Sequence, residues 1–204
     1  GFCAGQDLND RAVAPGEAMP DLGDSVENYY NPLIRLLTTM EKPVICAVNG
    51  VAAGAGANIA LACDIVIAAR SASFIESFSR LGLIPDSGGT WILPRLVGMA
   101  RARGLAMLGP KVSAEQAEAW GMIWQVVDDE ALMDTALGLA EQMATQPTRG
   151  FAFTKQALAA SAANSLDAQL ELEKELMRAA GRTHDYQEGV KAFLEKRQPN
   201  YKGE

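Results

Sequence analysis

Residues 46–90 limit the fold of this chain most tightly, because they alternate apolar, strand-like runs with loops of very small residues. Apolar runs rich in β-branched residues favour buried strands, whereas alanine- and glycine-rich segments allow close approach of the backbone. The expected elements are a strand at 44–48, a small-residue loop at 52–57, a helix at 58–63 and strands at 64–69 and 73–76. This order predicts an α/β unit in which short loops connect strands to helices.

A small-residue loop that runs into a helix presents main-chain N–H groups. The first N–H groups of a helix have no partner inside it, and the helix dipole adds partial positive charge there. The residues at 52–57 would let a ligand oxygen approach this backbone. A second loop, at 83–89, follows an apolar segment and carries one carboxylate, Asp86. Together the two loops indicate proton abstraction next to a carbonyl that main-chain amides polarise.

Both loops also have purely structural interpretations. The first contains neither GxGxxG nor GxxxxGK[ST], so its pattern does not specify an anion site. Asp86 precedes Ser87-Gly88-Gly89 and an apolar helical run, where an N-cap is the ordinary role of an aspartate. The pattern alone leaves these alternatives open.

Composition excludes several classes of function. The 204 residues suffice for one sizeable core, and the formal net charge of −7 argues against a nucleic-acid surface. No apolar run is long enough to span a bilayer, and no signal peptide is recognisable. The three cysteines lack a CxxC pair and the single histidine is His184, so we expect buried reduced thiols, no metal and a cytoplasmic protein.

The C-terminal part of the chain changes in character. We expect a core at 1–128 and a helical region at 129–204, in which apolar residues occur on more than one helix face. Residues 8–26, with Pro15-Gly16, Pro20 and Gly23, indicate a mobile loop over the site. The remaining expected elements are helices at 29–41, 91–97, 101–108, 130–144, 151–163, 166–180 and 184–197, a capping box at 113–116 and a strand at 124–127.

Five motifs resemble those of the crotonase, or enoyl-CoA hydratase/isomerase, superfamily: 2–8 (FCAGQDL), 49–56 (NGVAAGAG), 63–64 (CD), 82–90 (GLIPDSGGT) and 192–197 (AFLEKR). The resemblance covers essentially the whole chain. It implies a spiral of ββα units followed by a C-terminal helical trimerisation domain. In this family further strands and a helix precede the first motif, so we expect an N-terminally incomplete core.

The resemblance also implies the reaction class. By motif position, the backbone N–H groups of Gln6 and Ala55 form an oxyanion hole for a CoA thioester. The two glutamates of family hydratases are replaced by Asn58 and Phe78, neither of which is a base at neutral pH. Asp86 matches the carboxylate of isomerases in this family. The chain therefore resembles CoA-thioester isomerases, with epoxide-to-oxepin ring expansion and double-bond migration as candidate reactions.

The resemblance further implies substrate and CoA contacts at Ala4, Asp7, Leu8, Gly54, Phe78, Phe193 and Lys196. Ile75, Phe78, Ile84 and Trp91 are expected as apolar walls, and Tyr29 and Tyr30 either line the acyl pocket or anchor their helix. Asp7 is expected to brace the oxyanion loop. Strand alternation allows Glu76 to face the site, solvent or a neighbouring arginine.

The partners follow from the same resemblance. We expect an acyl-CoA substrate with no separate cofactor, and a homo-oligomer that is a trimer or a dimer of trimers. Association with another acyl-CoA enzyme is a further expectation, whereas nucleic acid and membrane are not expected. Two alternatives remain: a hydratase-like enzyme that uses an unusual water, and a non-catalytic interaction subunit.

Overall fold

The computed structural model describes residues 1–13, 16 and 18–204, and these residues form two compact units. Unit 1 comprises residues 1–37 and 45–136, and unit 2 comprises residues 38–44 and 137–204. Each unit has its own elements and is described separately. Within the described residues, none of the helices is both long and apolar enough to cross a membrane.

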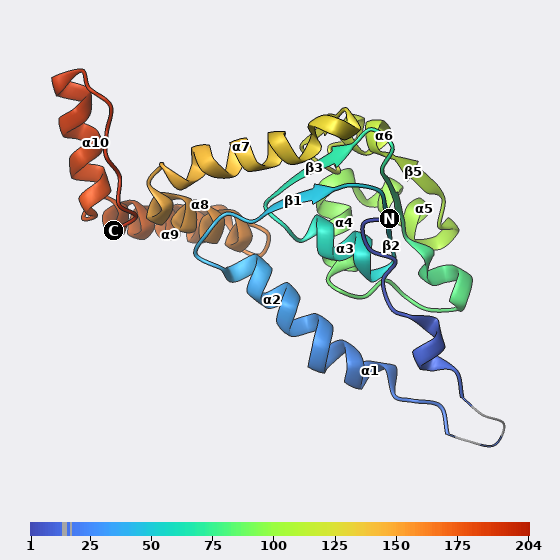
Figure 1. Cartoon of the computed structure of the whole chain (residues 1–204). Coiled ribbons are helices and arrows are strands. Elements are labelled where there is room, and N and C mark those ends of the chain that lie inside the picture. The colour runs from blue at the N-terminus through green and yellow to red at the C-terminus, as the bar shows by residue number, and fades with distance from the viewer. Residues whose placement is uncertain (14–15, 17) are drawn as a thin grey trace. The chain divides into compact units, whose positions relative to one another are not determined.

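Two three-stranded sheets form the frame of unit 1 (Figure 1). The first is parallel throughout and contains β1 (Ile45–Val48), β3 (Ile65–Ala69) and β6 (Gln125–Val127), in the order β1-β3-β6. The second contains β2 (Val51–Ala53), β4 (Ser73–Ile75) and β5 (Lys111–Ser113); β2 and β4 are parallel, and β5 is antiparallel to β4. Their inward residues are fully buried, for example Val48, Ile67 and Phe74.

Small residues precede or fill several helices of unit 1. Six of the seven residues of helix α3 (Ala55–Leu61) are buried, and four of the seven are alanine or glycine, which lets the helix pack closely on its neighbours. Glycines in positive-φ or otherwise non-helical conformations precede α4 (Gly89–Val97) and α5 (Met99–Leu108). The hydroxyl oxygen of Ser113 accepts a hydrogen bond from the Gln116 N–H and caps α6 (Ala114–Ala119), as the sequence predicts. A 3-10 turn, η3 (Ser77–Leu81), follows β4.

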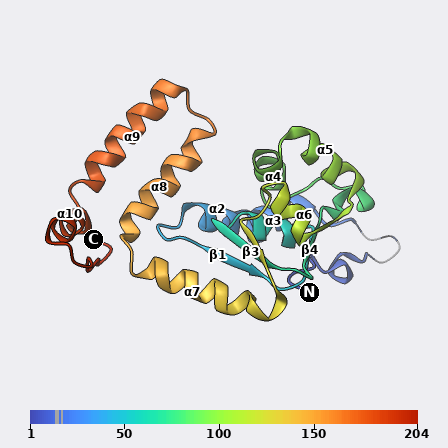
Figure 2. The same cartoon turned by 90° about the horizontal axis from the view of Figure 1, so that it is seen from above.

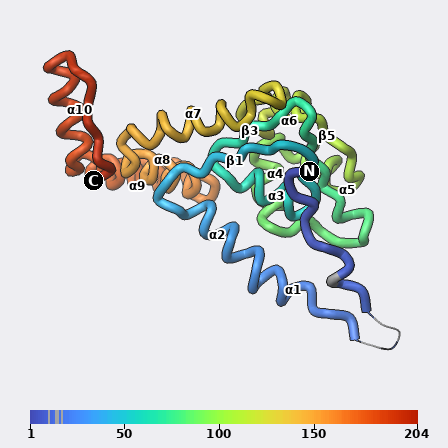
Figure 3. Tube along the Cα trace, viewed as in Figure 1, coloured from blue at the N-terminus to red at the C-terminus, as the bar shows by residue number. Residues whose placement is uncertain are grey.

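The N-terminal segment runs beside β2 (Figure 3). Cys3 forms a parallel bridge with Ala52, and the Ala53 N–H donates to the Cys3 carbonyl at 2.9 Å. The expected loop at 8–26 contains helical turns: η1 (Leu8–Arg11), α1 (Leu22–Ser25) and the start of η2 (Val26–Tyr30), which leads into α2 (Asn31–Thr39). Ala14, Pro15 and Glu17 of that loop lie outside the described residues.

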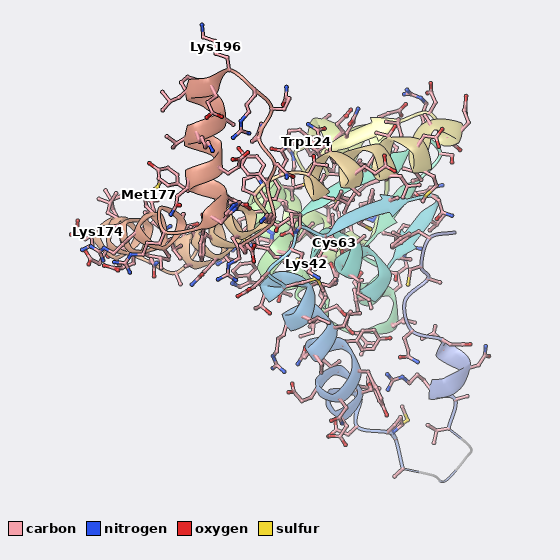
Figure 4. The ribbon with its side chains drawn as sticks, turned by 60° about the vertical axis from the view of Figure 1, so that its left-hand side comes forward. Lys42, Cys63, Trp124, Lys174, Met177 and Lys196 are labelled. Carbon is pink, nitrogen blue, oxygen red and sulfur yellow. The ribbon has the colours of Figure 1, made fainter. Side chains whose placement is uncertain are left out.

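Unit 2 is helical. Helices α8 (Thr148–Ser161) and α9 (Leu166–Ala180) lie side by side as a hairpin (Figure 2), and the Gln169 side chain donates to the Ala157 carbonyl at 3.0 Å. Helix α10 (His184–Glu195) follows, with Lys196 beyond its end (Figure 4). Asp185, which is 2% exposed, accepts hydrogen bonds from the N–H groups of Lys202 and Gly203, so a buried carboxylate fixes the C-terminal residues.

The structure adjusts several expected elements. Strands β2 and β5 were not expected; two residues of β2 fall within the small-residue loop expected at 52–57. The expected helix at 29–41 begins as the π-helical turn η2. The helix expected at 130–144 begins with a 3-10 turn, η4 (Asp129–Ala131), and continues as α7 (Leu132–Ala144). The prediction for α9 matches the observed bounds, which Ser165 defines by capping the helix.

Candidate active site

Unit 1 contains a cavity of about 420 Å³ that collects most of the predicted site residues. Its walls are largely apolar, which favours an acyl or aryl group over a charged ligand. Five lining residues have polar side chains. The lining residues are Ala4, Gly5, Gln6, Leu8, Arg11, Met19, Pro20, Leu22, Val26, Tyr30, Gly54, Ala55, Ser77, Phe78, Leu81, Leu83 and Asp86.

Two main-chain segments meet at one wall of this cavity. Gly5 has a φ of +83°, and a Cβ there would come within 2.9 Å of the Ala53 carbonyl oxygen and 3.3 Å of the Ala55 nitrogen. The tight fit therefore requires glycine. Among the described residues, the N–H groups of Gln6 and Ala55 donate to no protein acceptor. Two such donors beside an apolar cavity are suited to hold an oxygen that gains negative charge.

Asp86 brings a carboxylate to the same cavity. It does not cap helix α4, because Gly88 occupies the N-cap position; the N-cap interpretation is therefore wrong. Its backbone carbonyl accepts from the Gly89 N–H at 2.8 Å, and its side chain accepts from the Ser87 hydroxyl at 2.9 Å. Ser87 is 1% exposed and has a φ of +50°, so the chain makes a left-handed turn directly after Asp86.

Burial raises the pKa of Asp86 above the usual aspartate value. The hydrogen bond from Ser87 and the positive charge of Arg11 act in the opposite direction and moderate the increase. A partly desolvated carboxylate of this kind is a stronger base than one in water. It can take a proton from carbon and, once protonated, return it to carbon.

Three polar side chains form a network on the cavity wall. Tyr30 Oη donates to Gln6 Oε1 at 2.9 Å, and Arg11 Nη2 donates to the same oxygen at 3.2 Å and to Ser25 Oγ at 2.6 Å. Burial and then the negative charge of Asp86 raise the pKa of Tyr30, which keeps its phenol protonated. The network fixes the side chain of Gln6, the residue whose backbone N–H is one of the two predicted oxyanion donors.

A buried polar group lies behind the loop that carries Asp86. Asn58 Nδ2 donates to the Asp86 carbonyl at 3.0 Å and to Glu76 Oε2 at 3.4 Å. Glu76 is 3% exposed, so the sequence-based alternative that it faces solvent is wrong. Burial, followed by the nearby charge of Asp86, raises the pKa of Glu76 to about 7, while the bond from Asn58 opposes the shift. Glu76 comes directly after the end of β4 at Ile75 and is buried like Phe74, two positions before it.

Other predicted residues lie elsewhere. Ile75, Ile84 and Trp91 do not line the cavity, and Ile84 is 79% exposed. Trp91 instead stacks under the guanidinium of Arg95. Tyr29 is 75% exposed, whereas Tyr30 lines the cavity. The leucines at 22, 81 and 83 form the walls in their place.

Three predicted ligand contacts are not lining residues of this cavity. The side chain of Asp7 caps the turn η1 by accepting from the Asn9 N–H. Phe193 and Lys196 belong to unit 2, where Phe193 is 83% exposed and lines a second cavity of about 760 Å³. The side chains of the described residues form no cluster of three or more histidines, cysteines or acids that suits a metal ion.

The cysteines are free thiols, as expected, but only Cys46 is buried; Cys3 and Cys63 are partly exposed. Cys46 lies next to Cys63, and the hydrogen bond between them together with burial raises the pKa of the Cys46 thiol. A thiol with a raised pKa is a poor nucleophile at neutral pH.

Comparison with known proteins gives consistent matches over the full chain. The sequence profile of the family described as "Enoyl-CoA hydratase/isomerase" matches residues 1–204. The chain is 65% identical over 203 residues to "1,2-epoxyphenylacetyl-CoA isomerase" of Escherichia coli, covering 100% of this chain and 78% of that protein. It is 37% identical over 202 residues to "2,3-dehydroadipyl-CoA hydratase" of the same organism, covering 99% and 77%. The crystal structure of enoyl-CoA hydratase from Bacillus anthracis superposes with a TM-score of 0.91 at 36% identity, covering 100% and 77%.

Proposed function

Because the chain belongs to the enoyl-CoA hydratase/isomerase family, we propose that it is an isomerase of acyl-CoA thioesters that uses Asp86 as its proton-transfer group. The observation that carries this proposal is the single carboxylate in an apolar cavity that also contains two free main-chain donors. The 65% identity to an isomerase supports the same class. The favoured substrate is a ring-1,2-epoxyphenylacetyl-CoA, converted to an oxepin-CoA within phenylacetate catabolism.

The reaction is an isomerisation without net gain or loss of atoms. In double-bond migration only a proton moves, whereas ring expansion also breaks the ring carbon–carbon bond that the epoxide oxygen bridges, and the electron pair of that bond joins the π system of the oxepin. The thioester oxygen accepts hydrogen bonds from the N–H groups of Gln6 and Ala55. Asp86 removes a proton from the carbon next to the carbonyl, and the electron pair moves onto the thioester as an enolate. Protonated Asp86 then delivers the proton to a different carbon of the acyl group. Such donors reduce the barrier by about 2.7–4 kcal/mol each, and no cofactor beyond the substrate's own CoA is needed.

A hydratase requires a group that activates water. Asn58 cannot do so, because its amide is not basic and is held by Asp86 and Glu76. Phe78 is apolar and lines the cavity. The alternative function is hydration of the substrate through an unusual water, and it is supported by the similarity of this chain to a hydratase. Turnover in ¹⁸O-labelled water separates the two: the isomerase gives an unlabelled product of unchanged mass, whereas a hydratase adds one labelled oxygen.

The decisive variant is Asp86→Asn, tested against a panel of aryl-epoxide and 3-enoyl-CoA esters. We expect kcat to fall by a factor of about 10²–10⁴, the usual contribution of a positioned acid–base group, while the Kd for the ester stays within about threefold because the wall contacts remain. Asp134→Asn changes an exposed aspartate on α7 and is the matched control. Full activity of Asp86→Asn would overturn the assignment. A wild type that turns over no ester would favour the non-catalytic subunit.

We further propose a homo-oligomer, a trimer or a dimer of trimers, in the cytoplasm. Unit 2 supports this because it exposes a set of large apolar side chains, and exposed apolar surface of this kind marks interfaces. These are Leu166, Leu170, Met177, Val190, Phe193 and Leu194. Phe193 and Lys196 would contact the CoA of a neighbouring subunit. Association with another acyl-CoA enzyme remains part of the same proposal.

The oligomer is tested with Phe193→Asp, which places a charge on the exposed apolar face of α10. We expect a smaller species by multi-angle light scattering and a raised KM for the CoA ester. Lys191→Asp introduces the same side chain on the same helix and is the control for helix effects. A monodisperse wild-type monomer with full activity would contradict the proposal.

A further inference from the structure

The buried carboxyl of Glu76 has no part in the proposed proton transfer. A single residue, Asn58, nevertheless connects it to the loop that carries Asp86. Asn58 Nδ2 connects the two: it donates to the Asp86 carbonyl at 3.0 Å and to Glu76 Oε2 at 3.4 Å. Asn58 is 1% exposed and Glu76 is 3% exposed. A polar link with so little solvent contact is costly unless its hydrogen bonds are made.

Two buried oxygen atoms of Asn58 and Glu76 have no hydrogen-bond partner in the part of the chain that the structure describes. Among the described residues, Asn58 Oδ1 and Glu76 Oε1 are both buried acceptors without a hydrogen bond. They belong to two groups that already touch through Nδ2 and Oε2. One proton on Glu76 turns Oε1 into a donor, and Asn58 Oδ1 is the acceptor that needs one. The pairing would then be that of a carboxylic acid with a primary amide.

Asn58 also occupies a particular place on helix α3. Ala55, whose N–H is the predicted oxyanion donor, lies one turn before Asn58 on the same helix. The side chain of Asn58 therefore ties the helix that carries this donor to the loop that carries Asp86. Gly89 packs tightly against Asn58, because a Cβ at position 89 would overlap the Asn58 amide.

We propose that Glu76 is a positioning residue: it fixes Asn58, and through Asn58 it sets the Asp86 carboxylate relative to the oxyanion donor of Ala55. The proposal rests on the proposed isomerase function. Glu76 acts in its protonated form, which supplies the second hydrogen bond to Asn58. Ionisation removes that donor and places a second negative charge near Asp86.

Asp86 is the charged group that influences the pKa of Glu76. Helix α3 and strand β2 contain no charged residue. The charged side chains on η3, β5, α5 and α6 are exposed: Arg80, Arg101, Arg103, Lys111, Glu115 and Glu118. The pKa of Glu76, raised to about 7 by burial first and Asp86 second, is consistent with a carboxyl that holds its proton up to neutral pH.

Two substitutions separate hydrogen bonding from charge. Glu76→Gln keeps the shape and supplies both a donor and an acceptor to the Asn58 amide at every pH. Glu76→Met keeps the approximate volume and supplies neither. For Glu76→Met we expect kcat to fall at least tenfold with KM within twofold of wild type. For Glu76→Gln we expect kcat within threefold of wild type at pH 6.

The pH profile is the readout that a merely structural residue would not change. Wild-type kcat should decline as pH rises above about 7, and this decline should be absent in Glu76→Gln. Ser113→Ala loses the cap of α6 and serves as a control for lost stability alone; its kcat profile should match that of wild type. Retention of the alkaline decline in Glu76→Gln, or a Glu76→Met kcat within twofold of wild type, overturns the proposal.

An infrared measurement tests Glu76 without relying on turnover. At pH 6 wild-type protein should show the carbonyl stretch of a buried protonated carboxyl, which disappears on titration to pH 9 and is missing in Glu76→Gln. Absence of this band from wild type overturns the proposal. If the band is present but no CoA ester is turned over, the proposed function fails while the protonated Glu76 stands, so the two failures are distinguishable.

Discussion

The hydroxyl of Tyr30 donates a 2.9 Å hydrogen bond to the side-chain oxygen of Gln6, and both residues line the cavity that contains Asp86. The bond joins the helical turn η2 to the segment that carries one predicted oxyanion donor. Arg11 donates to the same oxygen at 3.2 Å, so the position of Gln6 depends on two donors from different elements.

Tyr30→Phe should therefore weaken catalysis without abolishing it. Removing one neutral hydrogen bond costs about 0.5–1.5 kcal/mol, which corresponds to a roughly 2- to 12-fold fall in kcat/KM. Tyr29→Phe, at the adjacent exposed position, is the matched control and should leave kcat/KM unchanged. The measurement is steady-state turnover of the best CoA ester. Equal effects of the two variants would contradict the role assigned to Tyr30.

Ser87 affects the base directly. Its hydroxyl donates to Asp86 Oδ1 at 2.9 Å and lowers the pKa of Asp86 against the effect of burial. Ser87→Ala removes that bond, so the pKa of Asp86 should rise. Activity requires ionised Asp86 and is lost as pH falls through this pKa. The acid limb of the kcat/KM profile should therefore move to higher pH in Ser87→Ala.

A glycine at the same position separates the hydrogen bond from backbone strain. Ser87 has a φ of +50°, a left-handed conformation that costs a non-glycine residue about 1–2 kcal/mol. Ser87→Gly should shift the acid limb as Ser87→Ala does, yet unfold at a higher denaturant concentration than Ser87→Ala. Urea titration of both variants checks this. Equal stabilities would show that the turn carries no such strain.

Gly89 is required by the side chain of Asn58 rather than by its own backbone angle. A Cβ at position 89 would overlap the Asn58 amide, so Gly89→Ala must displace the groups that hold the Asp86 loop. Overpacking of this kind costs about 1–3 kcal/mol. Gly104→Ala is the control: nothing lies within 4 Å of a Cβ there, and it is inside helix α5, so it should stabilise by about 0.5–1 kcal/mol. Stability changes of the same sign would contradict this reading.

The sequence predicted the parts of the site that local pattern determines. The bounds expected for the small-residue loop at 52–57 and the helix at 58–63 were wrong, because β2 extends to Ala53 and α3 begins at Ala55. The small residues and the carboxylate after an apolar run were nevertheless the right signals, since the structure brings Ala55 and Asp86 to one cavity. Helix α9 was predicted with its observed bounds, because Ser165 caps it and leucines repeat at helical spacing. These features depend on neighbours in the chain, which a single sequence contains.

The features that were missed depend on contacts between distant residues. Glu76 is buried against a partner 18 positions away in the chain, Asn58, whose amide donates to it. Ile84 and Trp91 were expected in the wall because they are apolar. The left-handed residues Ser87 and Gly88 turn the loop differently, and no apolar pattern reports such a turn.

The stability of the chain should also depend on pH through Glu76. Its pKa is raised from an ordinary 4.5 to about 7 in the folded state. The folded state is stabilised as long as Glu76 keeps its proton. This stability is fully present below pH 4.5 and is lost as pH rises through about 7. At about 1.4 kcal/mol per pKa unit, the loss is on the order of 3 kcal/mol. Glu76→Gln has no ionisable group at this position. The free energy of unfolding of Glu76→Gln should therefore exceed that of wild type by little at pH 5 and by nearly the full amount at pH 8. Urea unfolding at both pH values measures this difference, and a difference that is the same at both would contradict a raised pKa for Glu76.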